Sequence, residues 1–446
     1  MATRNHTDAD FNSKSREVQC KLAVYFDSTP VEFTSYGANK CIMQLDITEE
    51  AYAEGTDVLG DVSANYIDIK LYNSNGMFSP TNPNGPYVGK IKLNVKIIPY
   101  LRLVNSVDTL NWVQLGVFYV SDWNAAITAS TASIYATDIM QEVITCDSTE
   151  IHIRTEHTFK TFLDYYFDAL GYYASVDSSL TTSIPYAYAD AKVKSTINKL
   201  ISAAKALCFS SRTGTVTVRA INNGAALRAT LTDSDQIVSI ASKQSLLKTY
   251  DGVDLTYKLP QLTAGQEVLS MSGVGIEAGV STLTDLAFDA GPVYAIESLQ
   301  IKSVESDVTL NSFAYTPWLL TITTNNTDTV DSLVDISVQG TTLELTDAVL
   351  SDKAYSMLTY SNPYLQSKAT AESYKLFLEA FVDTVLPTLT LQIRGNLLLT
   401  IGDKITISSV KYGVTYTGII IRAKHTYVGY LSSTITLLNS SIVEAA

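Results

Sequence analysis

Histidines and cysteines that stand near one another are the first candidates for chemistry in this sequence. The stretch HIRTEH, residues 152–157, carries two histidines five positions apart. A zinc-binding helix of the H-E-x-x-H kind needs them four apart on one face, and this stretch precedes the expected start of a helix. The four cysteines form no C-x-x-C pair and have no histidine pair at metal spacing beside them. The spacing predicts no metal site and free, mostly buried thiols. The cysteines are Cys20, Cys41, Cys146 and Cys208.

Two other short stretches imitate ligand-binding loops. GVGIEAG, residues 273–279, has the spacing G-x-G-x-x-x-G, and no helical pattern follows that could point a helix dipole at a phosphate. We interpret it as a glycine-rich loop. NNTDTVD, residues 325–331, could gather carboxylates around calcium, but it lacks the central glycine and the closing glutamate of an EF-hand loop. An irregular ion site stays open there, and no cofactor is predicted.

A nucleophilic enzyme would need a serine or cysteine beside a histidine and a carboxylate. Cys146 with His152 or His157 is the one Cys/His neighbourhood in the sequence. Nothing marks an oxyanion hole or an orienting group near it. His425 alternates with apolar residues in an expected strand, so we expect it to be packed in the core or at its rim. The sequence therefore predicts no catalytic residues.

The composition is that of a globular, acidic protein. Of 446 residues, 46% are hydrophobic and 17% are charged, and the formal net charge is -14. A chain of this length buries a sizeable core and typically forms about three domains. The negative charge argues against nucleic-acid binding of the usual basic kind. Residues 1–17 are too polar for a signal peptide, and no apolar run approaches the ~18 residues of a membrane helix, so we expect synthesis and folding in the cytoplasm.

Alternation with a period of two predicts strands over most of the chain, including residues 20–26, 67–71 and 91–97. The most apolar of these segments is WVQLGVFYVSDW, residues 112–123. Read as one strand, it places Val113, Leu115, Val117, Tyr119 and Trp123 on one side and Trp112, Phe118 and Val120 on the other. Because both sides are apolar, we expect both faces to be covered.

Residues 151–220 combine helical and strand patterns and predict a small α/β unit. Two apolar helical stripes, beginning near Phe159 and Val193, precede a hairpin. The expected caps and turn are Thr158 and Gly171 for the first helix, Asp190 for the second and Gly214 for the hairpin.

Strand patterns return on either side of a third helix. Residues 221–350 show short strands and threonine-rich loops, and the last sixty residues are strands again. The third helix has Thr370 as its expected cap and cannot continue through Pro387. Strand-rich blocks at both ends predict barrels or sandwiches that are closed by segments distant in sequence.

Lys90, Lys92 and Lys96 line the polar side of the expected strand that ends at Pro99. In an acidic protein, such a basic stripe can contact an acidic neighbouring subunit. It can also be a solvated strand face that discourages edge-to-edge aggregation. The sequence leaves both interpretations open.

The order of several segments resembles a known family, the tail hub proteins of tailed bacteriophages, which are relatives of the T-even baseplate hub. SANYIDIKLYNSNGMFSPTNPNGPYVGKIKLNV followed by LGVFYVSDW is similar to the N-terminal part of these proteins. TFLDYYFDALGYY with CFSSRTGTVTVRA resembles their second domain, and NPYLQSKATAESYKLFLEAF with LQIRGNLLLTIGDKITI resembles their return to the first barrel. The family often has a proline after R-G-N, where this chain has Leu397. Residues 221–350 match only in character.

The resemblance implies a β-rich α+β fold: two tube-type β-barrels, an inserted small α/β domain and a further mixed domain. Residues 1–150 would form the N-terminal part of the first barrel, and 151–220 the α/β domain. Residues 221–350 would form a β-rich domain with the second barrel and connecting segments, and 351–446 a helix with the strands that complete the barrel region. Three copies would place six barrels around a central channel. The resulting packing or interface candidates are Trp112, Phe118, Tyr119 and Trp123, with Lys90, Lys92 and Lys96.

The resemblance implies a virion structural protein and no enzyme. Such a homotrimeric tail hub joins a sixfold tail tube or distal tail ring to a threefold spike or fibre. It lines the channel for the tape measure protein and for DNA, which passes without specific binding; no membrane is involved. The 27 tyrosines and three tryptophans also fit a tail-tip adhesin that stacks sugars on exposed rings. A tail-associated peptidoglycan hydrolase would need paired carboxylates or a Cys/His dyad in a cleft.

Overall fold

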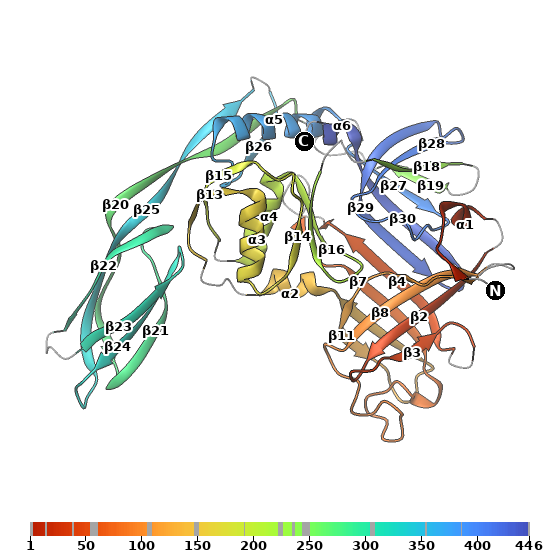
Figure 1. The fold of residues 1–446 in the computed structure, drawn as a ribbon, viewed down its shortest axis with the longest axis horizontal. Helices are drawn as coiled ribbons and strands as arrows, with labels where there is room; N and C mark the ends of the chain where they lie inside the picture. The colour runs from red at the N-terminus through yellow and green to blue at the C-terminus, as the bar shows by residue number, and fades with distance from the viewer. Residues whose placement is uncertain are drawn as a thin grey trace.

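The computed structural model describes residues 3–444, except 14–15, 38–39, 54–60, 105–108, 147–150, 191, 222–225, 234–236, 243–249, 304–307, 353–354 and 385. The described chain is mostly strands with few helices, as predicted. Three parts follow one another along the longest axis in Figure 1: an elongated β region, a small α/β domain and a large sheet assembly. The expected domain boundary at residue 150 lies outside the described residues.

The largest sheet joins the two ends of the chain. It has 16 strands, and in it β29 (Val414–Tyr427) runs antiparallel to β4 (Ile42–Glu50) over six residue pairs, from Arg422 opposite Glu50 to Tyr427 opposite Leu45. The sheet is thus completed by segments distant in sequence, as predicted. No sheet of the described residues is closed, so the expected arrangement of two tube-type barrels is not confirmed.

The N-terminal part supplies most of these strands. Its elements are β1 (Thr3–Arg4), α1 (Asp8–Asn12), β2 (Glu17–Tyr25), β3 (Val31–Thr34), β4, β5 (Tyr52–Ala53), β6 (Asp61–Val62), β7 (Tyr66–Tyr72), the 3-10 turn η1 (Ser74–Gly76), β8 (Lys96–Val104), β9 (Thr109–Leu110), β10 (Val113–Gln114), β11 (Phe118–Asn124), β12 (Thr131–Thr137) and α2 (Ile139–Thr145). Their inward side chains form one buried core with Leu397, Tyr427 and Leu431 from the C-terminal part.

The C-terminal part completes the same sheet. Its elements are β18 (Leu227–Thr232), β19 (Ile237–Ser242), α5 (Lys368–Asp383), β27 (Thr388–Ile393), β28 (Lys404–Ser409), β29, β30 (Leu431–Asn439) and α6 (Ser440–Glu444). α5 begins after Ser367, whose hydroxyl accepts a hydrogen bond from Thr370 N. The expected cap Thr370 is therefore wrong, because a serine one turn earlier caps the helix. The helix ends before Pro387, as predicted.

The α/β domain contains β13 (Arg154–Thr158), α3 (Phe159–Ala169), β14 (Ala174–Val176), β15 (Ser183–Ala187), α4 (Val193–Ala203), β16 (Ala206–Ser210) and β17 (Val216–Ala220). α3 begins after its cap Thr158 and ends before Gly171, which has φ +81°, as predicted. The expected cap Asp190 is wrong: α4 begins after Lys192, and the Asp190 carboxylate instead accepts from the Ser195 hydroxyl.

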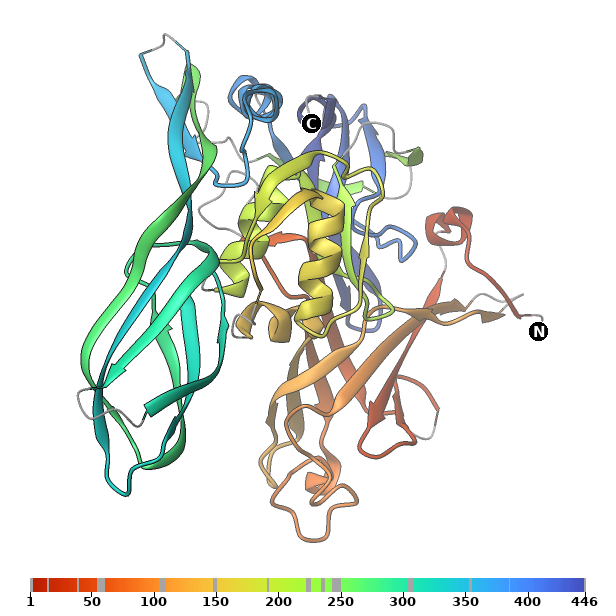
Figure 2. The same cartoon turned by 60° about the vertical axis from the view of Figure 1, so that its left-hand side comes forward.

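Residues 252–361 form a long projection that we call the arm (Figures 1 and 2). Its strands are β20 (Gly252–Ile276), β21 (Gly279–Ala287), β22 (Val293–Ser303), β23 (Val308–Tyr315), β24 (Leu319–Asn326), β25 (Ser332–Ser351) and β26 (Met357–Ser361). They form two sheets, ordered β22-β25-β20-β26 and β21-β24-β23, around a separate apolar core. The expected β-rich stretch 221–350 is therefore shared between the large sheet, which takes β18 and β19, and the arm.

The segment 112–123 is not one strand. β10 and β11 are separate, and Gly116 between them has φ +145°. β11 also has a bulge between Val120 and Asp122, which brings Trp123 to the same core as Phe118 and Val120. The predicted alternation, which put Trp123 on the opposite side from these two residues, is therefore wrong.

The strand expected at residues 91–97 is also wrong in its first half. β8 begins at Lys96, and the preceding residues form turns in which Asn94 has φ +61° and Leu93 is 65% exposed. Asparagine tolerates this left-handed backbone and favours a turn over strand pairing. Lys90 and Lys92 consequently do not share a strand face with Lys96.

Candidate functional site

The hairpin of the α/β domain places an arginine between the N-terminal and C-terminal strands. Arg212 lies in the turn between β16 and β17. Its Nε and Nη2 donate to the two carboxylate oxygens of Glu49, each at 2.7 Å. It also donates to the carbonyls of Leu397 and Leu399, the second at 3.0 Å. One side chain thereby ties three distant segments together.

His425 completes this buried group. Its Nδ1 lies 2.6 Å from Ser433 Oγ, and its Nε2 lies 3.3 Å from Glu49 Oε2. Burial raises the pKa of Glu49, but attraction and hydrogen bonds from Arg212, helped by His425, outweigh it and lower that pKa to about 2. His425 is 1% exposed, which confirms that it is packed. The arrangement suits a structural ion pair, because its members have little access to any substrate.

A second polar group joins the same two parts. The Asn65 side chain accepts from Glu50 N at 2.8 Å and donates to Ser210 O, at the end of β16, at 3.0 Å. Asp138 caps α2 by accepting from Met140 N at 3.0 Å. Burial raises the pKa of Asp138 to about 7, although its hydrogen bonds act in the opposite direction. The α/β domain is thus held to the large sheet by buried, directional contacts.

The hairpin also covers part of the outer face of the segment 112–123. Gly214 lies against Val117: a Cβ atom added at this glycine would be 3.1 Å from Val117 Cβ. Gln114 Nε2 donates to Arg212 O at 2.7 Å. Val117 is 8% exposed and packs with Ala23 and Ile98, beside the half-buried Tyr119. The second face of the segment is therefore partly covered within one chain.

The rest of that outer face carries cations on aromatic rings. The Arg102 guanidinium lies 4.2 Å from the Trp112 ring centroid and 5.6 Å from that of Tyr36. Lys96 Nζ lies 5.3 Å from the Tyr25 ring centroid. We call this surface of β2, β8 and β10 the cation–aromatic face. Its members are Lys21, Tyr25, Tyr36, Lys96, Tyr100, Arg102 and Trp112, all half-buried.

The predicted interface residues therefore lie in different environments. Phe118 and Trp123 belong to the core, and the Trp123 indole donates to Phe78 O at 3.0 Å. Trp112 and Lys96 belong to the cation–aromatic face. The other two lysines lie elsewhere on the surface: Lys90 pairs with Asp27 at 3.0 Å, and Lys92 is exposed.

The motifs that imitate catalytic or metal sites have other roles. The ring centroids of His152 and Tyr315 lie 4.6 Å apart, and His157 Nδ1 lies 3.2 Å from Thr161 Oγ1. Cys146 Sγ donates to Val143 O at 3.0 Å. In the part of the chain that the structure describes, no three His, Cys, Asp or Glu side chains are grouped to hold a metal ion.

The two expected loops of the arm take different forms. Most of GVGIEAG belongs to β20, and its last glycine begins β21, so the interpretation as a loop is wrong for all but a tight turn. NNTDTVD spans the turn between β24 and β25. There Asn326 Nδ2 donates to Ile276 O at 3.2 Å and Val330 O at 3.0 Å, which stabilises the turn.

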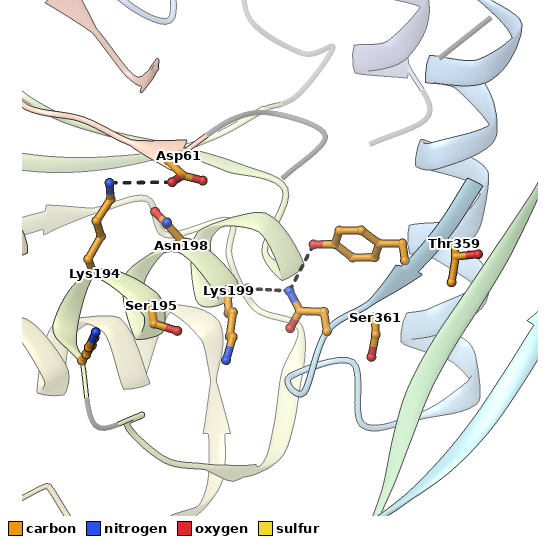
Figure 3. Close-up of a pocket in the computed structure, with 10 residues that line it drawn as sticks. Asp61, Lys194, Ser195, Asn198, Lys199, Thr359 and Ser361 are labelled. Carbon is orange, nitrogen blue, oxygen red and sulfur yellow. Dashed lines mark hydrogen bonds and ion pairs between the residues drawn. The ribbon is translucent and has the colours of Figure 1, made fainter. Parts of the chain in front are cut away.

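A polar pocket lies between α4 and β26, at the base of the arm (Figure 3). Lys194 faces Asp61 at 3.7 Å, and Lys199 pairs with Asp190 at 2.5 Å. Asn362 Nδ2 donates to Lys199 O at 2.8 Å. The described lining contains no cysteine or histidine. The Asn362 contact joins the segment that follows the arm to the α/β domain.

Sequence reasoning missed Arg212 and Glu49. The available signals were an arginine at the tip of a tight hairpin and two adjacent glutamates at the end of an apolar strand. Neither shows that the two residues meet.

None of the helices in the described ranges is both long and apolar enough to cross a membrane.

Comparisons with known proteins give a match in fold only. No family model and no curated protein matches the sequence. Among solved structures, the 43 kDa tail protein of prophage MuSo2 from Shewanella oneidensis has a TM-score of 0.53 at 10% identity, covering 95% of this chain and 99% of that chain. The tail protein from Neisseria meningitidis MC58 has a TM-score of 0.53 at 9% identity, covering 96% and 99%.

The chain thus has the fold of phage tail proteins, over nearly its whole length. The resemblance to phage tail hub proteins that the sequence segments suggested is confirmed at the level of the fold.

Proposed function

We propose that this protein is a structural component of a phage virion: a homotrimeric tail hub that joins a sixfold tail tube or distal tail ring to a threefold spike or fibre. It performs no chemistry, and it is made in the host cytoplasm before assembly into the tail tip. The observation that carries the proposal is the fold shared with two phage tail proteins along almost the entire length of all three chains.

The internal construction of the chain supports a role in transmitting force. The N-terminal and C-terminal strands share one sheet, and Arg212, Glu49 and His425 fasten the α/β domain to it. Removing one partner of such a buried pair leaves an unpaired charge, so the parts resist separation. A connector between a tail tube and a spike needs this rigidity.

The cation–aromatic face supports association between copies. Trp112 is half-buried in the single chain, with its ring under Arg102. Burying apolar surface stabilises a complex by about 25 cal/mol per Å2. A neighbouring copy that covers these rings would therefore contribute several kcal/mol to the free energy of association, before the cost of ordering side chains is subtracted. The large sheets of three copies would enclose a channel for the tape measure protein and DNA. The acidic balance of the chain would keep DNA from adhering to the wall.

A tail-tip adhesin that stacks sugars on tryptophan has less support. A sugar-stacking site needs aromatic rings open on loops. Trp123 is 9% exposed, and the half-buried Trp318 donates its indole N–H to Ala189 O at 2.7 Å. All three tryptophans lie in the described part of the chain, and none of them is exposed.

The stoichiometry tests the hub proposal. Native mass spectrometry of the purified protein, alone and with the other tail-tip proteins of its phage, should give a species with three copies of the chain. A chain that stays single at every concentration and in every subassembly would overturn the proposal.

A further inference from the structure

The negative charge of this protein is concentrated in the arm. Residues 252–361 contain 14 Asp and Glu but only 3 Lys, so their formal charge is -11, against -14 for the whole chain with its 45 acidic and 31 basic residues. The remaining residues, with 31 acidic and 28 basic side chains, are close to balance at -3. The molecule is therefore electrostatically asymmetric.

Several arm carboxylates accept hydrogen bonds from backbone amides of the irregular strand β20. Asp289 accepts from Ser270 N at 3.1 Å, and Asp335 accepts from Gly273 N at 3.0 Å. Among the described residues, the arm carboxylates that pair with cations are Asp347, with Lys258, and Asp352, with Lys375 of α5. Most of the arm's negative charge is thus available to a partner.

The cation–aromatic face has one paired cation, Lys21, which lies 2.8 Å from Glu32, and two others, Arg102 and Lys96, with a different environment. Arg102 donates through Nε and Nη2 to the neutral Gln19 Oε1, at 3.0 and 2.7 Å, and no carboxylate of the described residues pairs with it. Lys96 lies on the Tyr25 ring, and within the same described ranges it likewise has no carboxylate partner. Aromatic rings position both cations, so each can still pair with a carboxylate of another molecule.

The arm and the strands β2 and β8, which carry this face, lie at opposite ends of the molecule, with the α/β domain between them (Figure 1). An arm therefore does not reach the face of its own chain. A contact between unlike surfaces of successive copies is heterologous, and it closes into a ring when the rotation allows. Opposite charges at the two ends favour this head-to-tail orientation over a self-complementary one.

We propose that the acidic arm of one copy docks on the cation–aromatic face of the next copy, with Lys96 and Arg102 as the cations that receive it. This rests on the proposed homotrimer and names the surfaces that form it. The arm supplies carboxylates on exposed strand positions, of which Glu267 and Glu344 are examples. Aromatic rings around the cations exclude water from the contact and so strengthen it.

Zero-length coupling tests the contact directly. Copies grown in 14N and 15N media are mixed, assembled and treated with a carbodiimide. The reagent activates a carboxylate, a touching lysine amine displaces it to form an amide, and the carbodiimide leaves as its urea. Peptides that link Lys96 of one isotope to a carboxylate of residues 252–361 of the other are expected. If assembled trimers yield no such mixed peptide, the docking inference is overturned while the trimer stands.

Charge reversal gives the second test. The double variant K96E/R102E should raise the concentration needed for half-assembly at least tenfold at low salt, and it should remove most of the salt dependence of assembly. Adding E267K/E344K should recover part of the loss. Lys92→Glu is the control, because it reverses one positive charge, half the change of the double variant, at an exposed position outside the face. Folding of each variant is checked by its thermal unfolding curve.

The outcomes separate the two ideas. Native assembly by folded K96E/R102E, with unchanged salt dependence, would refute the docking contact alone. Absence of assembly by the unaltered chain in every subassembly would refute the trimer and the docking contact together.

Discussion

Arg212 and Glu49 meet through two parallel hydrogen bonds of 2.7 Å although 163 residues separate them in the sequence. The side chain of Glu49 is 6% exposed and that of Arg212 is 14% exposed. The pair joins the α/β domain to the first strands of the chain, and the guanidinium extends the connection to the C-terminal part through two carbonyls. The rigidity of the proposed connector depends on this contact.

Arg212→Ala should lower the free energy of unfolding by about 3–5 kcal/mol, because it leaves the buried Glu49 carboxylate without its cation. Urea unfolding at pH 7 measures this loss. Lys160→Ala is the control, since it breaks the half-buried pair with Asp164, which has far more contact with solvent than Glu49, and should cost less than about 1 kcal/mol. Similar losses in both variants would show that the buried pair has no special role.

Acid should weaken the same junction. The pKa of Glu49 is lowered to about 2 in the folded chain from its ordinary value of 4.5. Its stabilisation is fully present above about pH 4.5 and is lost as the pH falls towards 2, amounting to about 3 kcal/mol. In Glu49→Gln this part of the pH dependence should disappear, although the variant is less stable at neutral pH. Unfolding free energies between pH 2 and 5 provide the comparison.

Asp138 should have the opposite pH dependence. Its pKa is raised to about 7 from 3.8, so the folded state holds a proton that the unfolded state releases. Stability from this group is present below about pH 4 and decreases as the pH rises to about 7, by at most about 4 kcal/mol. The stability of Asp138→Asn relative to the native protein should therefore increase as the pH rises from 4 to 8. A constant difference between the two across this range would contradict the assignment.

Gly214→Ala tests the packing of the hairpin on the outer face of the segment 112–123. Gly214 has φ +86° and would bring a Cβ to 3.1 Å from Val117. Gly171 is the control, because it has φ +81° and nothing within 4 Å of an added Cβ. Each alanine should lower the free energy of unfolding by about 1–2 kcal/mol because of the left-handed backbone. Gly214→Ala should lower it further, because its Cβ also meets Val117. Combining it with Val117→Ala should remove the excess.

Local features of the fold could be predicted from the sequence. α3 was bounded correctly by Thr158 and Gly171, and the hairpin turns at Gly214, because caps and tight turns depend on neighbouring residues. The pairing of the chain's two ends also followed from strand-rich blocks on either side of the α/β unit.

Long-range and irregular features could not. A bulge at Val120 reverses the side of the strand on which Trp123 lies. Strict alternation along the sequence assumes a strand without bulges, so it cannot predict this reversal. The contact of Arg212 with Glu49 depends on how separate sheets are placed, which no spacing reveals. The arm was missed as a unit for the same reason: β20 and β25 pair along nearly their full lengths across an inserted sheet.

The most direct test of the hub proposal is averaged electron microscopy of the phage tail end, viewed along the tail axis, with the position of this chain marked by a specific antibody fragment. We expect three marked copies around an open channel, with each arm reaching the large sheet of its neighbour. A single copy at the periphery of the tip, away from the axis, would contradict it.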